Sequence, residues 1–123
     1  MAHEIVKPSF VRSDARGTFV EVLNGAAWEN LIAGNMNPGA ALGHHYHKET
    51  RVFFYVVQGA VEIKTLHVDT GATDKFQLHD GEGVILQTFE SHVIRFQTPT
   101  QFIMMKSKRY DPGNPDTFEM RVE

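Results

Sequence analysis

The stretch RVFFYVVQ (Arg51–Gln58) is the part of the chain that decides the fold. Aromatic and β-branched residues fill it, and these residue types prefer a pleated surface. Because side chains alternate along a strand, the residues from Val52 to Val56 in steps of two would line one face, and those from Phe53 to Val57 the other. Both faces are apolar. We therefore expect a buried strand, with one face filling the interior and the other covered by a second sheet or by another subunit.

Similar short runs lie on both sides of this stretch, at roughly ten-residue spacing and separated by Gly, Pro, Asn and Asp. They are Phe10–Arg12, Thr18–Leu23, Leu31–Met36, Val61–Val68, Lys75–Leu78, Val84–Leu86, His92–Gln97 and Gln101–Lys106. No long window has a helical period, although Ala26–Ile32 could form one short helical turn. The pattern predicts an all-β sandwich or barrel.

The length of 123 residues indicates a single domain spanning 1–123. A chain of this size buries roughly two-thirds of its unfolded surface, which is enough for a real core. We expect a strand segment at the N-terminus and an irregular tail over about residues 111–123. The tail begins with Asp111-Pro-Gly-Asn-Pro115, which is incompatible with regular structure.

Composition excludes several classes of function. The formal net charge of −3 leaves no basic excess, so we expect no nucleic-acid partner. The chain has no cysteine, which rules out disulfides, thiolate metal sites and cysteine nucleophiles. No apolar run approaches the roughly 18 residues that span a bilayer, so we expect no membrane partner. The N-terminus has no signal-peptide apolar region, and we expect a cytoplasmic protein.

Seven histidines are the unusual feature, and three of them cluster in Gly43-His-His-Tyr-His-Lys-Glu49. In a strand, His45 and His47 would share one face and stand roughly 7 Å apart. His92 opens a later strand and could join them. Two imidazoles can share acid–base work, or three can hold one metal ion. The alternative is that these histidines are ordinary polar residues. The remaining histidines carry no predicted role: His3, His44, His67 and His79.

The histidine pattern resembles the cupin superfamily, whose first motif places His-x-His and then Gly, and whose second places Gly before His. His45, His47 and Gly59 match the first motif, and Gly83 and His92 the second. The resemblance implies a double-stranded β-helix, a small jelly roll with the site inside its barrel. The glutamate of the family's motif has no counterpart here. A metal site would therefore be His45, His47 and His92 with water, holding a divalent transition metal such as Zn, Fe, Mn or Ni.

A second resemblance is to cupins that modify nucleotide-linked sugars. Asp14-Ala-Arg-Gly-Thr-Phe-Val-Glu21 is similar to a segment of the dTDP-4-dehydrorhamnose 3,5-epimerases. The resemblance implies that Arg16 binds nucleotide phosphates and that Phe19 and Glu21 help bind the base. Arg95 is a second phosphate candidate, because a guanidinium fork suits a diphosphate. The epimerases' catalytic tyrosine would fall near Met104, which cannot donate a proton.

The central segment resembles the same epimerases, with His45 at the position of the catalytic base. It also resembles the sugar-nucleotide 3,4-ketoisomerases, in which both histidines act. The tail Tyr110–Phe118 is similar to the end of the cupin domain of capsular-polysaccharide dehydrogenases. Related cupins pair as dimers, and their N-terminal strand often reaches the neighbour's site. We expect a homodimer on these grounds and because the apolar strand at 51–58 has two faces to cover.

Three functions follow as hypotheses. The first is an isomerase or epimerase that acts on a nucleotide-linked keto-sugar in polysaccharide or deoxysugar biosynthesis, with His45 as base, His47 as its partner and no cofactor. The second is a three-histidine metal cupin with metal-assisted chemistry. The third is a module that binds a sugar or nucleotide without turnover.

Overall fold

The computed structural model describes residues 3–123, and every regular element in that range is a strand. The strands are β1 (Phe10–Asp14), β2 (Gly17–Glu21), β3 (Asn30–Met36), β4 (Ala41–Tyr46), β5 (Val52–Gln58), β6 (Ala60–His67), β7 (Thr73–His79), β8 (Glu82–Leu86), β9 (Glu90–Phe96), β10 (Thr100–Lys106) and β11 (Phe118–Glu119). The prediction of an all-β fold is confirmed.

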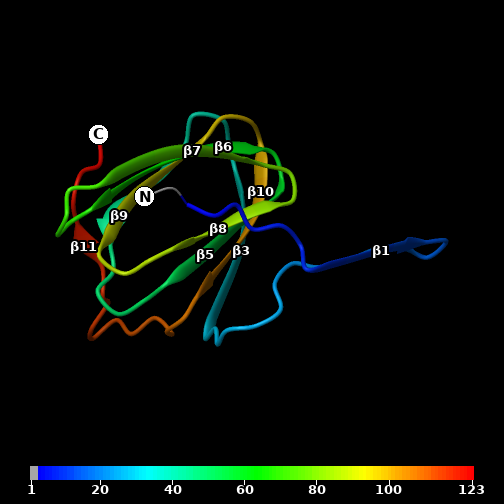
Figure 1. Cartoon of the computed structure of the whole chain (residues 1–123), viewed down its shortest axis with the longest axis horizontal. Helices are drawn as coiled ribbons and strands as arrows, with labels where there is room; N and C mark the ends of the chain where they lie inside the picture. Colours follow the sequence, from blue (N-terminus) through cyan, green and yellow to red (C-terminus); the bar gives the residue numbers. More distant parts are fainter. Residues whose placement is uncertain (1–2) are drawn as a thin grey trace.

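Two antiparallel sheets form the body of the molecule. One has the order β3-β10-β5-β8 and the other the order β11-β4-β9-β6-β7. Strands β1 and β2 form a separate two-stranded hairpin, which projects away from the body as an arm (Figure 1). We call β1 and β2 with their turn the arm. Strands that are far apart in the sequence lie side by side in both sheets, so each sheet forms only when distant segments of the chain pair.

The core lies between the two sheets. The inner face of β5 supplies Val52, Phe54 and Val56, all at most 1% exposed. The ring of Phe54 lies 6.3 Å from that of Phe96 on β9 and 5.3 Å from that of Phe102 on β10. Aromatic side chains of this size contribute much of the apolar burial that stabilises a small domain. The even-numbered face of β5 therefore fills the interior, as predicted.

Two of the three residues on the outer face of β5 are also buried, but by the same chain, whereas Val57 is 42% exposed. Phe53 and Tyr55 are 0% and 5% exposed. The Trp28 ring lies 6.3 Å from that of Phe53. Beside them, Val6 forms a backbone bridge to Gly83 on β8. The N-terminal segment and Trp28 thus cover the face for which a second sheet or another subunit was expected, and β5 provides no argument for a dimer.

Two local predictions are corrected. The segment Ala26–Ile32 forms no helical turn: β3 begins at Asn30, and it pairs with β10 from there. The tail is irregular as predicted except at Phe118 and Glu119, which form β11 and pair with Tyr46 and His45 of β4. Within residues 3–123 there is no helix of the length and apolarity required to cross a membrane.

Candidate functional site

The three histidines are placed by the pairing of β4 with β9. The register of this pair shifts between Gly43 and His45, where His44 forms a bulge with a φ of 59°. Gly43 makes this close approach possible. Its φ is 130°, and a Cβ there would stand 2.2 Å from the backbone oxygen of His92. Beyond the bulge, His45 lies directly opposite His92.

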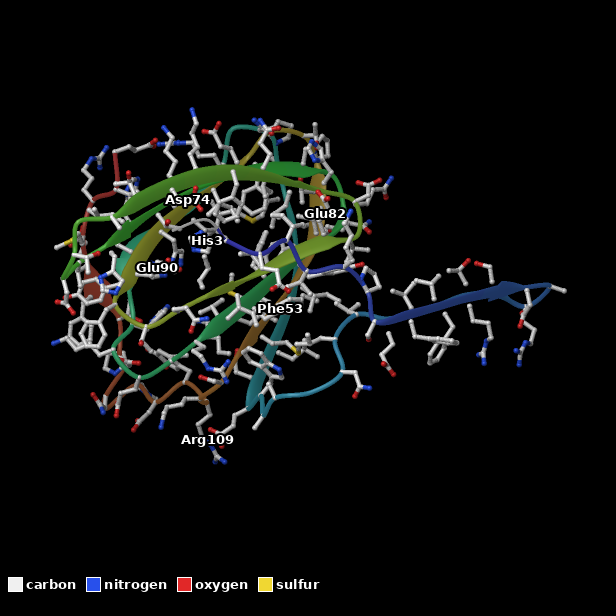
Figure 2. All side chains as sticks on the ribbon, viewed as in Figure 1. His3, Phe53, Asp74, Glu82, Glu90 and Arg109 are labelled. Carbon is white, nitrogen blue, oxygen red and sulfur yellow. The ribbon has the colours of Figure 1, made fainter. Side chains whose placement is uncertain are left out.

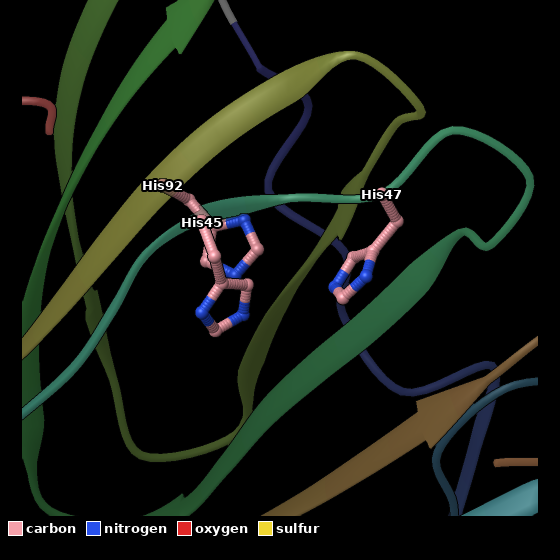
Figure 3. A group of neighbouring side chains, drawn as sticks. All are labelled: His45, His47 and His92. Atoms are coloured by element: carbon pink, nitrogen blue, oxygen red, sulfur yellow. The ribbon is translucent and has the colours of Figure 1, made fainter. Parts of the chain in front are cut away.

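The rings of His45, His47 and His92 converge in one place (Figure 3). Ring centroids of His45 and His92 are 4.8 Å apart, those of His45 and His47 are 5.2 Å apart, and those of His47 and His92 are 6.0 Å apart. His47 and His92 are only 5% and 3% exposed. The structure therefore brings together the three histidines that the sequence singled out.

Backbone carbonyl groups orient the rings of His47 and His92. The Nδ1 atom of His47 lies 2.7 Å from the carbonyl oxygen of Asp116, and that of His92 lies 3.4 Å from the carbonyl of Glu90. A carbonyl oxygen only accepts hydrogen bonds, so His47 donates through Nδ1–H, and its Nε2 carries a lone pair when the ring is neutral. That Nε2 atom is buried and has no hydrogen-bond partner among residues 3–123.

Burial keeps all three rings neutral at neutral pH. Desolvation lowers the pKa of His92 to about 3, helped by the neighbouring His45. It also lowers the pKa of His45, with His47 and Lys106 adding to the effect. The pKa of His47 is lowered by burial too, although its hydrogen bond to Asp116 acts in the opposite direction. Neutral imidazoles can accept a proton or ligate a metal ion.

Lys106 is a site residue that the sequence reasoning missed. It lies on β10 two residues after Met104 and four after Phe102, which faces the core, so it shares their inward face. Its charge disfavours protonation of all three histidines, which places it within electrostatic range of each. Burial lowers the pKa of Lys106, which makes its ammonium group a better proton donor. The alternation of Phe102, Met104 and Lys106 was the signal that could have identified it.

A cavity of about 260 Å³ opens next to His47. Its lining includes Lys106 from β10 and Tyr110 and Asp116 from the tail. Asn30, which pairs with Lys106 across β3 and β10, has a buried side-chain oxygen with no partner among the described residues. His47 therefore borders a space with several polar groups, as a ligand site requires.

The predicted substrate-binding residues of the N-terminal segment lie elsewhere in this chain. Arg16, Phe19 and Glu21 all belong to the arm, which points away from the histidines (Figure 1). Arg16 is paired with Asp14 at 2.6 Å, and Glu21 accepts a hydrogen bond from Ser9 at 2.9 Å. Phe19 is 54% exposed. A single chain does not bring these three residues to the histidine site.

Arg95 also lies apart from the histidines. His92, Ile94 and Phe96 face the interior of the barrel, so Arg95 points from the opposite face of β9. There it forms an ion pair with Glu123.

His3, to which the sequence assigned no role, is held firmly by β7 and β9. Its ring nitrogens donate to the carboxylates of Asp74 at 2.7 Å and Glu90 at 2.8 Å (Figure 2). The ring also lies 4.8 Å from the Phe76 ring. The hydrogen bond to Glu90 is the largest cause of a raised pKa for His3. This contact fastens the N-terminal segment to the sheet that carries His92.

The histidine site has the donor set for a divalent transition metal. One ligand atom from each of His45, His47 and His92 lies within 4.8 Å of the others. Neutral imidazoles whose second nitrogen faces a backbone carbonyl are typical metal ligands. The unpartnered Nε2 of His47 is the observation that fits most directly.

Comparison with known proteins gives a match to one family over most of the chain. Residues 12–118 match the family model described as the polysaccharide biosynthesis C-terminal domain. A curated relative, the UDP-2-acetamido-2,6-beta-L-arabino-hexul-4-ose reductase of Pseudomonas aeruginosa strain PA103, is 28% identical over 116 residues. That alignment covers 91% of this chain and 31% of the reductase.

Two solved structures show the same fold. The capsular polysaccharide assembling protein CapF from Staphylococcus aureus has a TM-score of 0.72 and 26% identity, over 92% of this chain and 34% of CapF. The dTDP-4-dehydrorhamnose 3,5-epimerase from Sulfolobus tokodaii has a TM-score of 0.79 and 19% identity, over 94% of this chain and 74% of the epimerase. The predicted jelly-roll cupin fold is therefore confirmed. The chain spans about a third of the length of the reductase and of CapF.

Proposed function

The chain belongs to the polysaccharide biosynthesis C-terminal domain family, and from that premise we propose that it is an isomerase or epimerase of a nucleotide-linked keto-sugar. The observation that carries the proposal is the convergence of three neutral histidines, two of them buried and His45 half-buried, beside the cationic Lys106. The relatives that work on sugar nucleotides support the substrate class, because their names include a UDP-linked hexul-4-ose and a dTDP-linked dehydrorhamnose.

The reaction needs a base and a group that stabilises negative charge on the ketone oxygen. His45 is the base: its neutral ring removes the proton from the carbon next to the ketone, and the electron pair moves onto the ketone oxygen. The ammonium group of Lys106 stabilises the resulting enolate. Return of a proton to the same carbon from the other side gives the epimer. Where that carbon bears a hydroxyl group, protonation of the enolate oxygen gives an enediol. Loss of the neighbouring hydroxyl proton and return of a proton to the former carbonyl carbon then give the isomeric ketone.

This assignment changes the role proposed for His47. A ring whose Nδ1–H is already donated to Asp116 has no spare proton when it is neutral. We therefore assign His47 to orienting the substrate by accepting a hydrogen bond from it. The proton-donating role passes to Lys106. The low pKa of His92 keeps its ring neutral, so His92 is neither the acid nor an effective base.

The arm supports a homodimer in which Arg16, Phe19 and Glu21 serve the site of a second copy. Large apolar side chains of the arm are exposed: Phe10 49%, Val11 54%, Phe19 54% and Val20 42%. Exposed apolar residues gathered on a projecting hairpin are typical of a protein interface. In this arrangement the partner's arm brings the guanidinium of Arg16 to the substrate's phosphates.

Solvent deuterium exchange tests the function directly. A UDP-linked 4-keto hexose is incubated with the protein in D₂O, and label at the carbon next to the ketone is followed by mass spectrometry. Wild-type protein is expected to incorporate deuterium, and His45→Gln to lose roughly 10²- to 10⁴-fold in rate. His44→Asn, at the neighbouring bulge, is the control and keeps the wild-type rate. A protein that binds the sugar nucleotide without exchanging label is a binding module, and the proposal then fails.

A metal-dependent cupin is the second candidate, favoured by the unpartnered Nε2 of His47 and the spacing of the ligand atoms. His45, His47 and His92 would hold the ion, which would polarise a carbonyl or acidify water. Metal content of untagged protein purified without nickel resin is the measurement. About one equivalent of Zn, Fe, Mn or Ni in the wild type and in His79→Ala, and its loss in His92→Ala, is the expected result. Equal content in both variants removes His92 from the site.

A further inference from the structure

The tail contacts the side chain of His47 through Asp116. Its carbonyl oxygen lies 2.7 Å from Nδ1 of His47. This contact joins residues 69 positions apart in the sequence. The tail therefore supplies a direct partner to a site histidine, although no side-chain pattern in Asp111–Phe118 indicated one.

The side chain of Asp116 fixes where that carbonyl points. Its carboxylate accepts hydrogen bonds from the backbone N–H of Lys48 at 2.9 Å and of Glu49 at 3.0 Å, and from the Thr50 hydroxyl at 2.8 Å. These three donors belong to the turn that follows His47. Burial opposes ionisation, but the hydrogen bonds from Lys48, Thr50 and Glu49 together with the neighbouring His47 outweigh it, so the pKa of Asp116 lies below its ordinary value.

The backbone of Asp116 confirms that this residue is tightly constrained. Its φ is 44°, in the left-handed region that costs energy for a residue with a side chain and that Asp tolerates better than most. Such a conformation persists only where the surroundings hold it. Here three hydrogen bonds to the carboxylate and one hydrogen bond from His47 to the backbone carbonyl hold Asp116 in this conformation.

We propose that Asp116 is a positioning residue that locks His47 as the Nδ1–H tautomer, with the Nε2 lone pair directed at the space shared with His45 and His92. The assignment rests on the proposed function, because the lock matters only if that site acts on a ligand. The lock itself is a structural feature. Without the carboxylate, the Asp116 carbonyl is no longer held toward His47, and the His47 ring is free to rotate or to change tautomer.

Nitrogen-15 NMR of histidine-labelled protein without substrate reads the tautomer directly. At pH 7.5 the wild type is expected to show His47 with a protonated Nδ1 and a bare Nε2. In Asp116→Gly, which keeps the positive-φ backbone conformation accessible and removes the side chain with its carboxylate, we expect a substantial population of the Nε2–H form. His45 signals assigned in the same spectra show whether the rest of the site is intact.

One matched pair and one further control separate positioning from simple attachment of the tail. Thr50→Val removes one of the three donors at nearly constant volume, and Thr50→Ser keeps it; the tautomer shift should appear only in the valine variant. Asp111→Asn alters another tail carboxylate, which accepts a hydrogen bond from Gly113 at 2.9 Å and touches no histidine. It should leave the His47 spectrum unchanged.

Kinetics add a readout that tail docking alone does not predict. In the deuterium exchange assay, Asp116→Gly should lower kcat roughly 10- to 100-fold with KM changed little, which is the range of losses found when groups that orient a functional ligand are removed. A folded Asp116→Gly protein whose His47 remains entirely the Nδ1–H tautomer overturns the proposal. A wild type that shows the lock but no exchange overturns the proposed function and leaves the lock standing.

Discussion

His45 and His92 are directly paired residues of β4 and β9, and their ring centroids are 4.8 Å apart. The pairing exists because the bulge at His44 shifts the register by one residue and Gly43 lets the two strands approach. His47 follows immediately after β4 and completes the cluster. The site thus depends on the backbone at 43–44 as much as on the imidazoles.

Replacement of Gly43 by Ala should destabilise the protein by about 2–4 kcal/mol, since the new Cβ collides with the backbone of His92 and adopts a φ that disfavours side chains. Chemical denaturation measures the free energy of unfolding. Gly25→Ala is the matched control, because Gly25 has a φ of 129° but nothing within 4 Å of its added Cβ. A loss no larger than that of the control contradicts the close approach of β4 and β9.

Lys106→Met should reduce the rate of deuterium exchange by roughly 10²- to 10³-fold, because the enolate loses its nearest cationic group. Methionine keeps the length and apolar stem of the side chain, so the fold should be retained. Lys75→Met on β7 removes the same charge far from the histidines and should have no effect. An exchange rate in Lys106→Met equal to that of the wild type would exclude Lys106 from the reaction.

The contacts of His3 predict a pH-dependent contribution to stability. The pKa of His3 is raised in the folded protein by Glu90 and Asp74, so the contribution is fully present below its unfolded pKa of about 6.5 and is lost as pH rises through the folded value. His3→Gln should therefore lower the free energy of unfolding by about 1–2 kcal/mol at pH 5.5 and by less at pH 8.5. Denaturation curves at both pH values provide the measurement. If the difference in the free energy of unfolding between the wild type and His3→Gln grows with pH, His3 is not held as the cation.

The exposed apolar residues of the arm predict a dimer in solution. The double variant Phe10→Ser/Phe19→Ser should shift the mass measured by light scattering at micromolar concentration from dimer toward monomer. Val57→Ser removes an apolar side chain that is 42% exposed on β5, outside the arm, and should leave the mass unchanged. A wild type that is already a monomer contradicts the proposed arrangement.

The strands and the histidine cluster could be predicted because their signals are local or simply periodic. The residues of Val52–Gln58 have strong strand preference on both faces, and the two histidine motifs fit a known barrel. The alternation that places Lys106 next to the histidines was also present in the sequence, but a lysine at the end of an apolar run is usually a solvated residue. Asp116 carried no such signal, because it acts on His47 through a backbone carbonyl that every residue possesses.

The two faces of β5 illustrate the same limit. The sequence showed that both needed cover, and it could not show that Trp28 and the segment around Val6 supply it from within the chain. Which distant segment covers an apolar face depends on the path of the whole chain and not on local composition. The separation of the arm from the histidines is a similar case, because motif order does not reveal which copy a projecting hairpin serves.

The hydrogen bond from His47 to Asp116 also sets an order of events during folding. The contact joins residues 69 positions apart, and Asp116 follows every strand except β11. Closing so long a loop is entropically costly until the two sheets have already brought its ends together. We therefore expect the barrel to form first and His47 to be oriented last, so that a folded barrel precedes a working site.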